Sequence, residues 1–487
     1  MAVTHDTLHV GAAASSSQEL NGSHGTISGN ETEAGIVAVE LEPHERASGA
    51  PPASMPAPMR NFYIIASGYL IFTFTDAALR MIVLFGLYQR RYQPFEIALM
   101  FTSYEALGVV TNLFGGIMGS RWGLRLCILG GLACQLVGIS LLFALLRADE
   151  DGWSRGAVIG YVIFAQCFAG VAKDLVKLAG KSVTKLVTKS EDENTRAAAA
   201  HSPLFRLVAW LTGAKNSIKG LGFFAGAALL NYAGVWPSLL VLAIFCLLVI
   251  PGCLRLDHDL GRSKTAGRLT LRKIFDKGYA VNMLSLARMF LFGSRDLWFE
   301  VVLPIYLRAM FNWSFTASGA FLAVWIVIYG AVQTATPEYI LKPLKCYPLR
   351  RGKLLVPWTA ALLTITIGLA SFLTAFRDTP YGEGSTGMLI GLAAFLIVFA
   401  FFFAVNSSMH SYLIVAYAGK DKVAINVGFY YCANAMGRLV GTLLSGWLFQ
   451  YQGGIWVCLW TSCGFLIVCA VVSVFLPDTD HALAGKV

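Results

Sequence analysis

Apolar runs long enough to cross a lipid bilayer recur along most of this sequence, and they limit its fold more than any other feature. A helix needs about 20 mainly apolar residues to span the hydrocarbon layer. About twelve runs of this length alternate with short polar loops, at residues 61–88, 94–119, 124–147, 156–180, 203–232, 235–256, 279–308, 315–341, 354–376, 387–417, 422–450 and 454–476. Only 14% of the residues are charged, against about 25% in soluble domains. The sequence therefore predicts an all-α membrane protein.

The segments outside these runs divide the chain. Residues 1–58 are rich in Ser, Gly, Ala, Glu and Pro, and such a segment cannot bury enough apolar surface to fold alone. We expect it to be a disordered tail without a cleavable signal or transit peptide. The longest and most basic loop, 257–278, separates a six-helix half at 59–256 from a second half at 279–477, and residues 478–487 form a second tail.

Basic residues are distributed unevenly between the loops. Loops on the side of the amino terminus hold about three times as many Lys and Arg residues as the opposite loops, a bias that marks the cytoplasmic side. Arg90 and Arg91 run against the bias. We expect both termini in the cytoplasm and the protein in the plasma membrane. The net charge of +10 lies mainly in these loops, so it indicates membrane-surface contacts rather than a nucleic-acid partner.

A ladder of lysines begins inside the fourth apolar run. It consists of Lys173, Lys177, Lys181 and Lys185, four residues apart, and Lys215 and Lys219 repeat this spacing. Residues four apart lie along one helical face. An ionisable side chain at membrane depth costs about 2.5–3.5 kcal/mol. These lysines therefore face water, a partner or a ligand, or they extend to the membrane surface as anchors.

The apolar runs contain more bases than acids. The bases are Arg80, Lys173, Lys177, Lys215, Lys219, Arg288, Arg295 and Arg438, and the acids are Asp76, Glu105, Asp174, Asp296 and Glu300. If every acid were paired with a base, cations would remain, and unpaired charge in a low-dielectric site needs a counterion. Arg binds oxyanions in a fork, and Lys acts as a compact point charge. We therefore predict a transported anion with more than one negative charge, carrying phosphoryl-type groups.

The predicted substrate-binding set combines most of these bases with two amides. It comprises Arg80, Lys173, Lys177, Lys215, Lys219, Arg295, Arg438, Asn112 and Asn216. The alternative is structural: Asp76 and Arg80, at i and i+4, are able to pair within one helix, and intramembrane Asn side chains often hydrogen-bond helix to helix. Arg295 and Asp296 are adjacent, so they point to different faces and each needs its own partner.

The acids are candidates for proton coupling or for charge pairing. A buried carboxylate that holds a proton is able to exchange it for substrate. Glu105 is the first candidate because the fewest bases lie near it in the sequence, and His410 is a secondary one. The other acids in this set are Asp76, Asp174, Asp296 and Glu300. The alternatives are that Glu105 pairs with a lysine and that His410 is a packing residue.

The two halves match at several positions, as expected after a duplication. Gly222, Tyr232 and Gly234 follow Lys219 at the same intervals at which Gly441, Tyr451 and Gly453 follow Arg438. Asp76 and Asp296 occupy matching places in the first and seventh runs. In duplicated transporters the substrate binds near the membrane midplane, between the repeats. The matches favour that architecture.

The segment GGIMGSRWGLR, between the second and third runs, resembles the signature Gly-x-x-x-Asp-Arg-x-Gly-Arg of the major facilitator superfamily. The residues of this gating motif are Gly115, Gly119, Arg121, Gly123 and Arg125, and Ser120 stands where the Asp usually does. Because a serine carries no charge, the resemblance does not extend to the charge-relay gating that is attributed to the Asp. The resemblance implies a twelve-helix bundle in two six-helix halves.

Longer segments resemble the organoarsenical efflux permeases of that superfamily. They are FTDAALRM, YEALGVVTNLFGG, GVAKDLVKLAGKSVTKL, LTGAKNSIKGLGFFAGAALL, ARMFLFGSRDLWF, FAVNSSMHSYLIV and VGFYYCANAMGRLVGTLLSGW, and the resemblance as a whole runs over residues 60–476, across all the predicted spans. The resemblance implies export of 1-arseno-3-phosphoglycerate, arsenate resistance, and functional coupling to glyceraldehyde-3-phosphate dehydrogenase, which forms this compound from arsenate. A molecule with an acyl arsenate group and a phosphate group suits a site with surplus cations.

Two other functions compete with this one. An organophosphate/phosphate exchanger of the same superfamily would use Arg80 and Arg295 as an anion clamp. A membrane enzyme or sensor is disfavoured, because the sequence has no H-E-x-x-H, nucleophile elbow or Walker loop, and we expect no enzyme activity. The ten Cys include no C-x-x-C and no Cys/His cluster of metal-ligand spacing. We therefore expect no metal, cofactor or disulfide.

Overall fold

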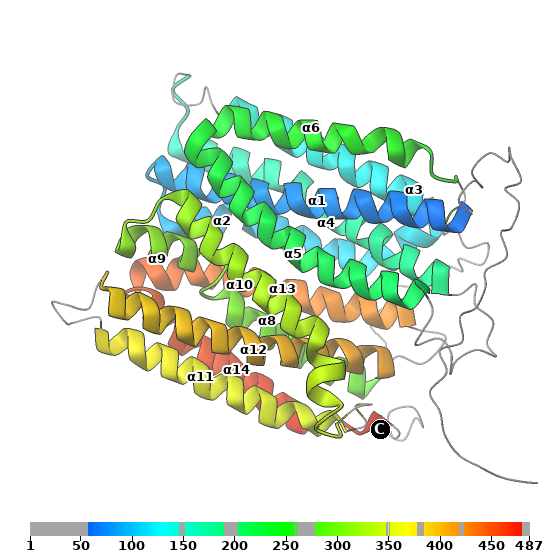
Figure 1. Cartoon of the computed structure of the whole chain (residues 1–487). Helices are drawn as coiled ribbons and strands as arrows, with labels where there is room; N and C mark the ends of the chain where they lie inside the picture. The colour runs from blue at the N-terminus through cyan, green and yellow to red at the C-terminus, as the bar shows by residue number, and fades with distance from the viewer. Residues whose placement is uncertain are drawn as a thin grey trace, which may run out of the picture. The chain divides into compact units, whose positions relative to one another are not determined.

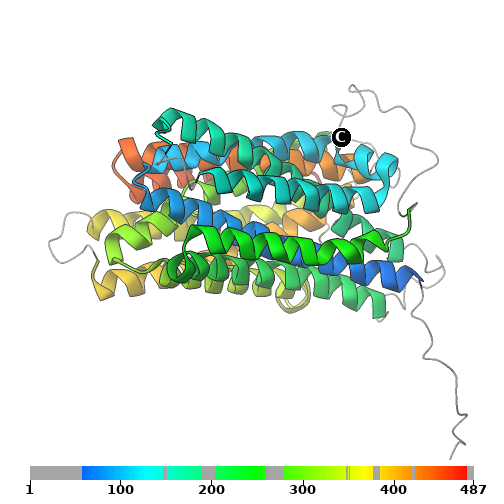
Figure 2. The same cartoon turned by 90° about the horizontal axis from the view of Figure 1, so that it is seen from above.

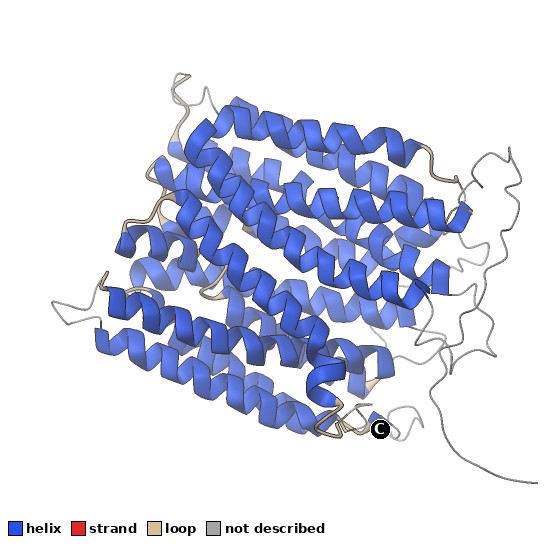
Figure 3. Ribbon diagram, viewed as in Figure 1, coloured by secondary structure: helices blue, strands red, loops and turns tan. Residues whose placement is uncertain are grey.

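The computed structural model of the chain describes residues 57–145, 151–188, 203–258, 260, 278–346, 349, 351–376, 384–417 and 423–479. These residues are almost entirely helical (Figure 3), and the β-type pairing found among them is one isolated bridge between Arg351 and Asp478. The prediction of an all-α protein is confirmed. Residues 1–56, 261–277 and 480–487, which include most of the predicted tails and central loop, lie outside the described residues.

The helices follow the predicted spans closely. They are α1 (Ala57–Gln89), α2 (Pro94–Met100), α3 (Thr102–Ala144), α4 (Arg155–Thr188), α5 (Pro203–Ala233), α6 (Val235–Leu254), α8 (Tyr279–Asp296), α9 (Val302–Phe311), α10 (Phe315–Ala335), α11 (Leu355–Phe376), α12 (Thr386–Tyr417), α13 (Val423–Tyr451) and α14 (Ile455–Val474). A π-helical turn, Thr336–Leu341, continues α10, and a 3₁₀ turn, Gly352–Leu354, precedes α11. Figures 1 and 2 show the helices side by side along one common direction.

Eight helices in the described parts of the chain are long and apolar enough to cross a membrane. The other four predicted spans, 94–119, 203–232, 279–308 and 422–450, coincide with helices that carry several of the predicted charged residues. Large apolar side chains also face outward: on α6, Leu240, Ile244, Leu247 and Leu248 are exposed along one face. Such a face is suited to lipid. The chain is an integral, multi-pass membrane protein.

The predicted span at 279–308 consists of two helices rather than one. Helix α8 ends at Asp296, α9 begins at Val302, and residues 297–301 form the turn between them. Pro304 explains the break, because it has no N–H to bond the carbonyl of Glu300 and its ring would clash with that carbonyl in a continuous helix. In the first turn of α9 the proline is tolerated. The break places Glu300 in a turn inside the bundle.

Gly123 separates the second and third predicted spans. It has φ 79° and ψ 162° inside α3, a conformation that essentially only glycine adopts without strain. Where the sequence predicted a loop between these two spans, the structure has one helix, α3, broken at Gly123. Gly115, Gly119 and Arg121 belong to α3, but their surroundings lie outside the described part of the structure, and Arg125 is half-buried.

Matching glycines pack matching helix pairs together. A Cβ on Gly222 of α5 would lie 2.6 Å from the carbonyl oxygen of Phe74 in α1, and a Cβ on Gly441 of α13 would lie 2.7 Å from that of Gly293 in α8. Contacts this short require glycine. The α5–α1 and α13–α8 pairs are thus equivalent, as a duplicated six-plus-six bundle requires, and the close approaches position the charged residues that follow.

Candidate functional site

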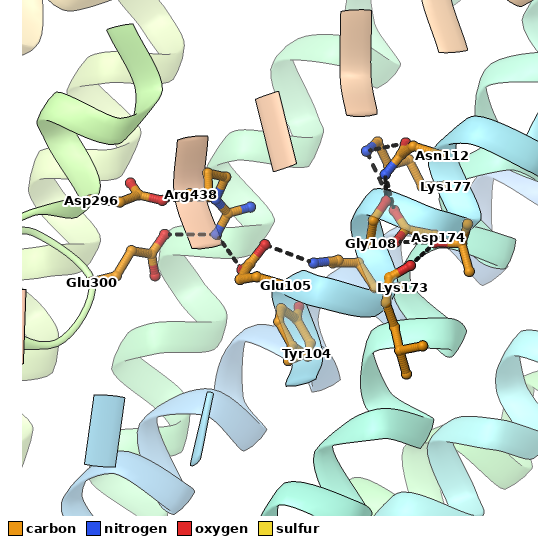
Figure 4. Close-up of polar contacts among 12 residues, drawn as sticks. Tyr104, Glu105, Gly108, Asn112, Lys173, Asp174, Lys177, Asp296, Glu300 and Arg438 are labelled. Atoms are coloured by element: carbon orange, nitrogen blue, oxygen red, sulfur yellow. Dashed lines mark hydrogen bonds and ion pairs between the residues drawn. The ribbon is translucent and has the colours of Figure 1, made fainter. Parts of the chain in front are cut away.

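Ionisable side chains from six helices and one turn meet in a single network. Its members are Arg80 of α1, Glu105 of α3, Lys173 of α4, Lys219 of α5, Arg295 and Asp296 of α8, Glu300 of the α8–α9 turn, and Arg438 of α13. Figure 4 shows Arg438 between Glu300 and Glu105, with Lys173 approaching Glu105 from the other side. The structure therefore brings together predicted residues from both sides of the central loop. We call this set the central ion network.

Glu300 is the most heavily paired acid in the central ion network. Its carboxylate is fully buried and contacts Lys219 Nζ at 3.6 Å, Arg438 Nη2 at 3.2 Å, Arg295 Nη2 at 3.5 Å, and Arg80 Nη1. It also lies two residues before α9, whose amino-terminal end attracts negative charge. The helix break and the four cations together hold this carboxylate in place.

Glu105 is paired with three bases in the structure, although few bases lie near it in the sequence. Its carboxylate lies 3.0 Å from Arg80 Nη2, 3.3 Å from Lys173 Nζ and 2.9 Å from Arg438 Nη2. These bases come from distant parts of the chain, so the residues near Glu105 in the sequence did not predict the contacts. The alternative in which Glu105 pairs with a lysine describes what the structure shows.

The structure also bears on two other pairings: Arg295 and Asp296 each have a partner of their own, Glu300 and Arg438, but they contact each other as well, and the alternative Asp76–Arg80 pair does not form. Arg295 and Asp296 contact each other directly, with Arg295 Nη2 at 2.5 Å from Asp296 Oδ1, and Asp296 also accepts a hydrogen bond from Arg438 Nε at 2.8 Å. The flexible Arg295 side chain folds back toward Asp296, although the Cα–Cβ bonds of adjacent helix residues point in different directions. Asp76 does not pair with Arg80.

Asp76 instead accepts hydrogen bonds from the hydroxyl of Tyr104, at 2.9 Å and 2.8 Å from its two oxygens. It is half-buried and forms no ion pair with any described residue. Tyr104 was not among the predicted site residues, although it directly precedes Glu105 in the sequence. Its ring also lies under Lys173 Nζ, 3.7 Å from the ring centroid, and under the guanidinium of Arg80. Tyr104 thus links the Asp76 carboxylate to the central ion network.

A second cluster lies one turn further along the lysine ladder. Lys177 Nζ is 3.5 Å from Asp174 Oδ1 and donates to Asn112 Oδ1 at 3.2 Å, while Asp174 also accepts from Thr111 at 2.6 Å and from Asn112 at 3.0 Å. Gly170 allows this approach of α4 to α3, because a Cβ there would lie 2.7 Å from the Tyr104 carbonyl oxygen. Asn112 therefore joins two helices as well as contacting a predicted binding lysine.

The accessible edge of these clusters is positive. The side chains of Lys219, Lys177 and Lys173 are 29%, 23% and 16% exposed. In contrast, Glu105, Asp296 and Glu300 are 0–1% exposed. Among the described residues the central ion network contains five bases and three acids, a surplus of two positive charges. An anion that reached this edge would meet ammonium groups first and carboxylates only behind them.

The remaining predicted residues lie near these clusters or elsewhere in the bundle. Lys215 is half-buried and forms no ion pair within the described ranges, and Asn216 donates to Gln333 of α10 at 3.1 Å. His410 is fully buried and neither ring nitrogen has a hydrogen-bond partner. The side chains of Lys181 and Lys185 lie outside the described part of the chain. Within the part that is described, no group of three His, Cys, Asp or Glu side chains is arranged to hold a metal ion.

Solved structures share this fold, whereas no protein-family model and no curated protein matches the sequence. A mutant of the nucleoside transporter NupG superposes with a TM-score of 0.60 at 15% identity, over 86% of this chain and 100% of that one. A bacterial homologue of the iron transporter ferroportin, in an inward-facing state, gives 0.62 at 14% identity, over 85% and 98%. Both neighbours are transporters rather than enzymes. The chain therefore has a helical membrane fold of the major facilitator type.

Proposed function

We propose that this protein is a secondary active transporter that exports an anionic organoarsenical, 1-arseno-3-phosphoglycerate, and so gives resistance to arsenate. The central ion network carries the proposal, because it gathers bases from α1, α4, α5, α8 and α13 around fewer acids. The fold supports a transporter, and the resemblance of the sequence segments to organoarsenical permeases suggests the substrate.

The charge of the site favours a substrate with at least two negative charges. A phosphoryl group alone carries about −1.5 to −2 at neutral pH, which would balance the surplus in the central ion network. Arg80, Arg295 and Arg438 offer forked donors, and Lys219 offers a point charge at the accessible edge. Oxygen-bound pentavalent arsenic has no need of thiolate ligands, so the buried cysteines need no role in binding.

Binding would also act on the contacts that join the helices. Arg80 ties α1 to Glu105 and Glu300, and Arg438 ties α13 to the same two acids. A bound anion would compete with these carboxylates for the guanidinium groups. Since the ion pairs join segments on both sides of the central loop, their exchange would couple substrate binding to movement of the two halves.

Asp76 is the carboxylate best placed to couple export to protons, in place of Glu105. The titratable and charged side chains that act on it are Arg80, Tyr104, Lys173, Lys219 and Cys246. The Tyr104 hydroxyl stabilises its charged form, and no described base forms an ion pair with it. A proton is therefore able to bind Asp76 without breaking a salt bridge, whereas protonation of Glu105 would release three bases.

We expect Asp76→Asn to remove the pH dependence of transport while substrate still binds. The amide keeps the shape of the protonated carboxyl group, so the variant is held in one charge state. Transport into inside-out vesicles over a series of external pH values measures this. A variant that keeps the wild-type pH profile would exclude Asp76 as the proton carrier.

Expression in an arsenic-sensitive bacterium tests the proposed function. We expect resistance to arsenate that depends on an active glyceraldehyde-3-phosphate dehydrogenase, and no resistance to arsenite, because only arsenate enters the dehydrogenase reaction. Arsenite resistance, or arsenate resistance without the dehydrogenase, would contradict the proposal. The coupling to the dehydrogenase is functional, through its product, and we place the protein in the plasma membrane with both termini in the cytoplasm.

The second candidate is an organophosphate/phosphate exchanger. The pairing of Arg80 and Arg295 with one carboxylate, Glu300, favours it, because these bases lie on the matching first and seventh spans and converge. Uptake of 3-phosphoglycerate into inside-out vesicles loaded with phosphate, without arsenate, separates the two functions.

A further inference from the structure

Arg288 of α8 is a buried cation that has no acidic partner among the described residues. Its side chain is 4% exposed and forms no ion pair with any residue that the structure describes. Its Nε donates to Asn434 Oδ1 at 3.1 Å, and its Nη1 donates to the Ser407 carbonyl oxygen at 3.1 Å and hydroxyl at 3.3 Å. These neutral acceptors orient the guanidinium but do not neutralise it, and an uncompensated charge in a low-dielectric interior is unfavourable.

A chain of neutral polar side chains extends from Arg288 across the bundle. Tyr329 and Gln333 of α10 both donate to the Ser407 hydroxyl, at 3.3 Å and 3.2 Å, and Gln333 accepts from Asn216 of α5 at 3.1 Å. Gln333, Asn216 and Asn434 are half-buried, so the two ends of the chain are accessible. The helices that carry it, α5, α8, α10, α12 and α13, are labelled in Figure 1.

This series of hydrogen-bonded polar side chains lies next to the central ion network. The ring of Phe292 lies close to both guanidinium groups, with its centroid 3.9 Å from Arg288 Cζ and 5.0 Å from Arg295 Cζ, so the groups are no further apart than these two distances together. Arg288 and Arg295 are seven residues apart, two helical turns on one face. Asn434 likewise precedes Arg438 by one turn.

We infer that Arg288, with Asn434, Gln333 and Ser407 around it, forms a second anion subsite that binds the far anionic end of a substrate held at the central ion network. The inference rests on the proposed function and specifies its substrate class: a short molecule with an anionic group at each end. The central bases bind one group, the Arg288 guanidinium binds the other, and the amides hydrogen-bond the atoms between them.

Two substitutions separate a binding role for Arg288 from a structural one. Asn434→Asp is nearly isosteric and puts a carboxylate 3.1 Å from Arg288 Nε, which neutralises the guanidinium without removing it. Arg288→Gln removes the charge. Asn312→Asp makes the same chemical change as the first variant at an exposed position after α9, in a left-handed conformation that Asp tolerates, and serves as the matched control.

The experiment measures binding of two stable probes to the purified full-length protein, together with its thermal midpoint. Glycerol 1,3-bisphosphate has two anionic ends and glycerol 3-phosphate has one. We expect the wild type and Asn312→Asp to bind the two-ended probe at least about tenfold more tightly than the one-ended probe. In Asn434→Asp and Arg288→Gln that preference should disappear, while binding of the one-ended probe changes little. Asn434→Asp should keep or raise the thermal midpoint, because it pairs a buried charge.

The opposite results would overturn the inference. If Asn434→Asp is stable and keeps the preference, Arg288 is a structural cation. If the wild type binds both probes equally well, there is no second subsite, and the proposed function remains. If the wild type binds neither probe and gives no arsenate resistance, both the subsite and the proposed function fail.

Discussion

Lys219→Ala and Lys177→Ala are each expected to abolish arsenate resistance in cells that make the variants at the wild-type level. Lys219 Nζ is 3.6 Å from the buried carboxylate of Glu300, and its side chain is the most exposed of the bases that pair in the central ion network. A charge-assisted contact is worth about 1.5–3 kcal/mol, or about ten- to a hundredfold in affinity. If the lysine also attracts the anion on entry, the export rate falls by more than the affinity does.

Lys342→Ala is the matched control for these variants. Lys342 pairs with Glu338 at 3.1 Å, but both side chains are more than 60% exposed, and such surface pairs contribute about 0–1 kcal/mol. The control should keep wild-type resistance. Full resistance in Lys219→Ala, with equal amounts of protein in the membrane, would remove this lysine from the binding site.

Glu300→Gln is expected to cause the largest loss of stability of any single isosteric change in the described part of the chain. The amide would replace a fully buried carboxylate that contacts Lys219, Arg295 and Arg438 as well as Arg80. Removing one partner from a buried ion pair costs about 3–5 kcal/mol, since the remaining charges stay buried. Packing is unchanged, so the effect reports charge alone. The thermal midpoint of the purified protein in detergent measures it.

Glu338→Gln tests whether this loss is specific to the buried network. It makes the same chemical change in an exposed pair, so its thermal midpoint should stay close to that of the wild type. If Glu300→Gln and Glu338→Gln have equally small effects, the carboxylate of Glu300 does not hold the cations of α1, α5, α8 and α13 together.

The sequence was sufficient to predict the helices and which ionisable residues lie within them, and the central ion network is made of such residues. Span length, the four-residue spacing of the lysines and the excess of bases all depend on local pattern, which a helix converts directly into position. The match between Gly222 and Gly441 also held, because each glycine packs its helix against an equivalent neighbour. The helix break before Pro304 was open to prediction too, since a proline cannot continue a helix through the residue four positions earlier.

The pairing inside the site was not predictable in this way. Glu105 contacts Arg438, more than three hundred residues away, and only the packed bundle determines that contact. Flexible side chains add a second difficulty: Arg295 turns back to Asp296, although the two residues point to different faces of the helix. Hence Glu105, with few bases near it in the sequence, is paired with three, and Asp76, four residues from Arg80, has Tyr104 as its partner among the described residues.

Arsenic accumulation in inside-out vesicles tests the central claim most directly. The vesicles, made from cells with the wild-type protein or with Lys219→Ala, are supplied with arsenate, glyceraldehyde 3-phosphate and NAD, with and without the dehydrogenase. We predict accumulation only with the wild-type protein and the dehydrogenase together. Equal accumulation in the Lys219→Ala vesicles, or none in the wild type when the arsenical is being formed, would show that the positive edge of the central ion network does not carry this anion.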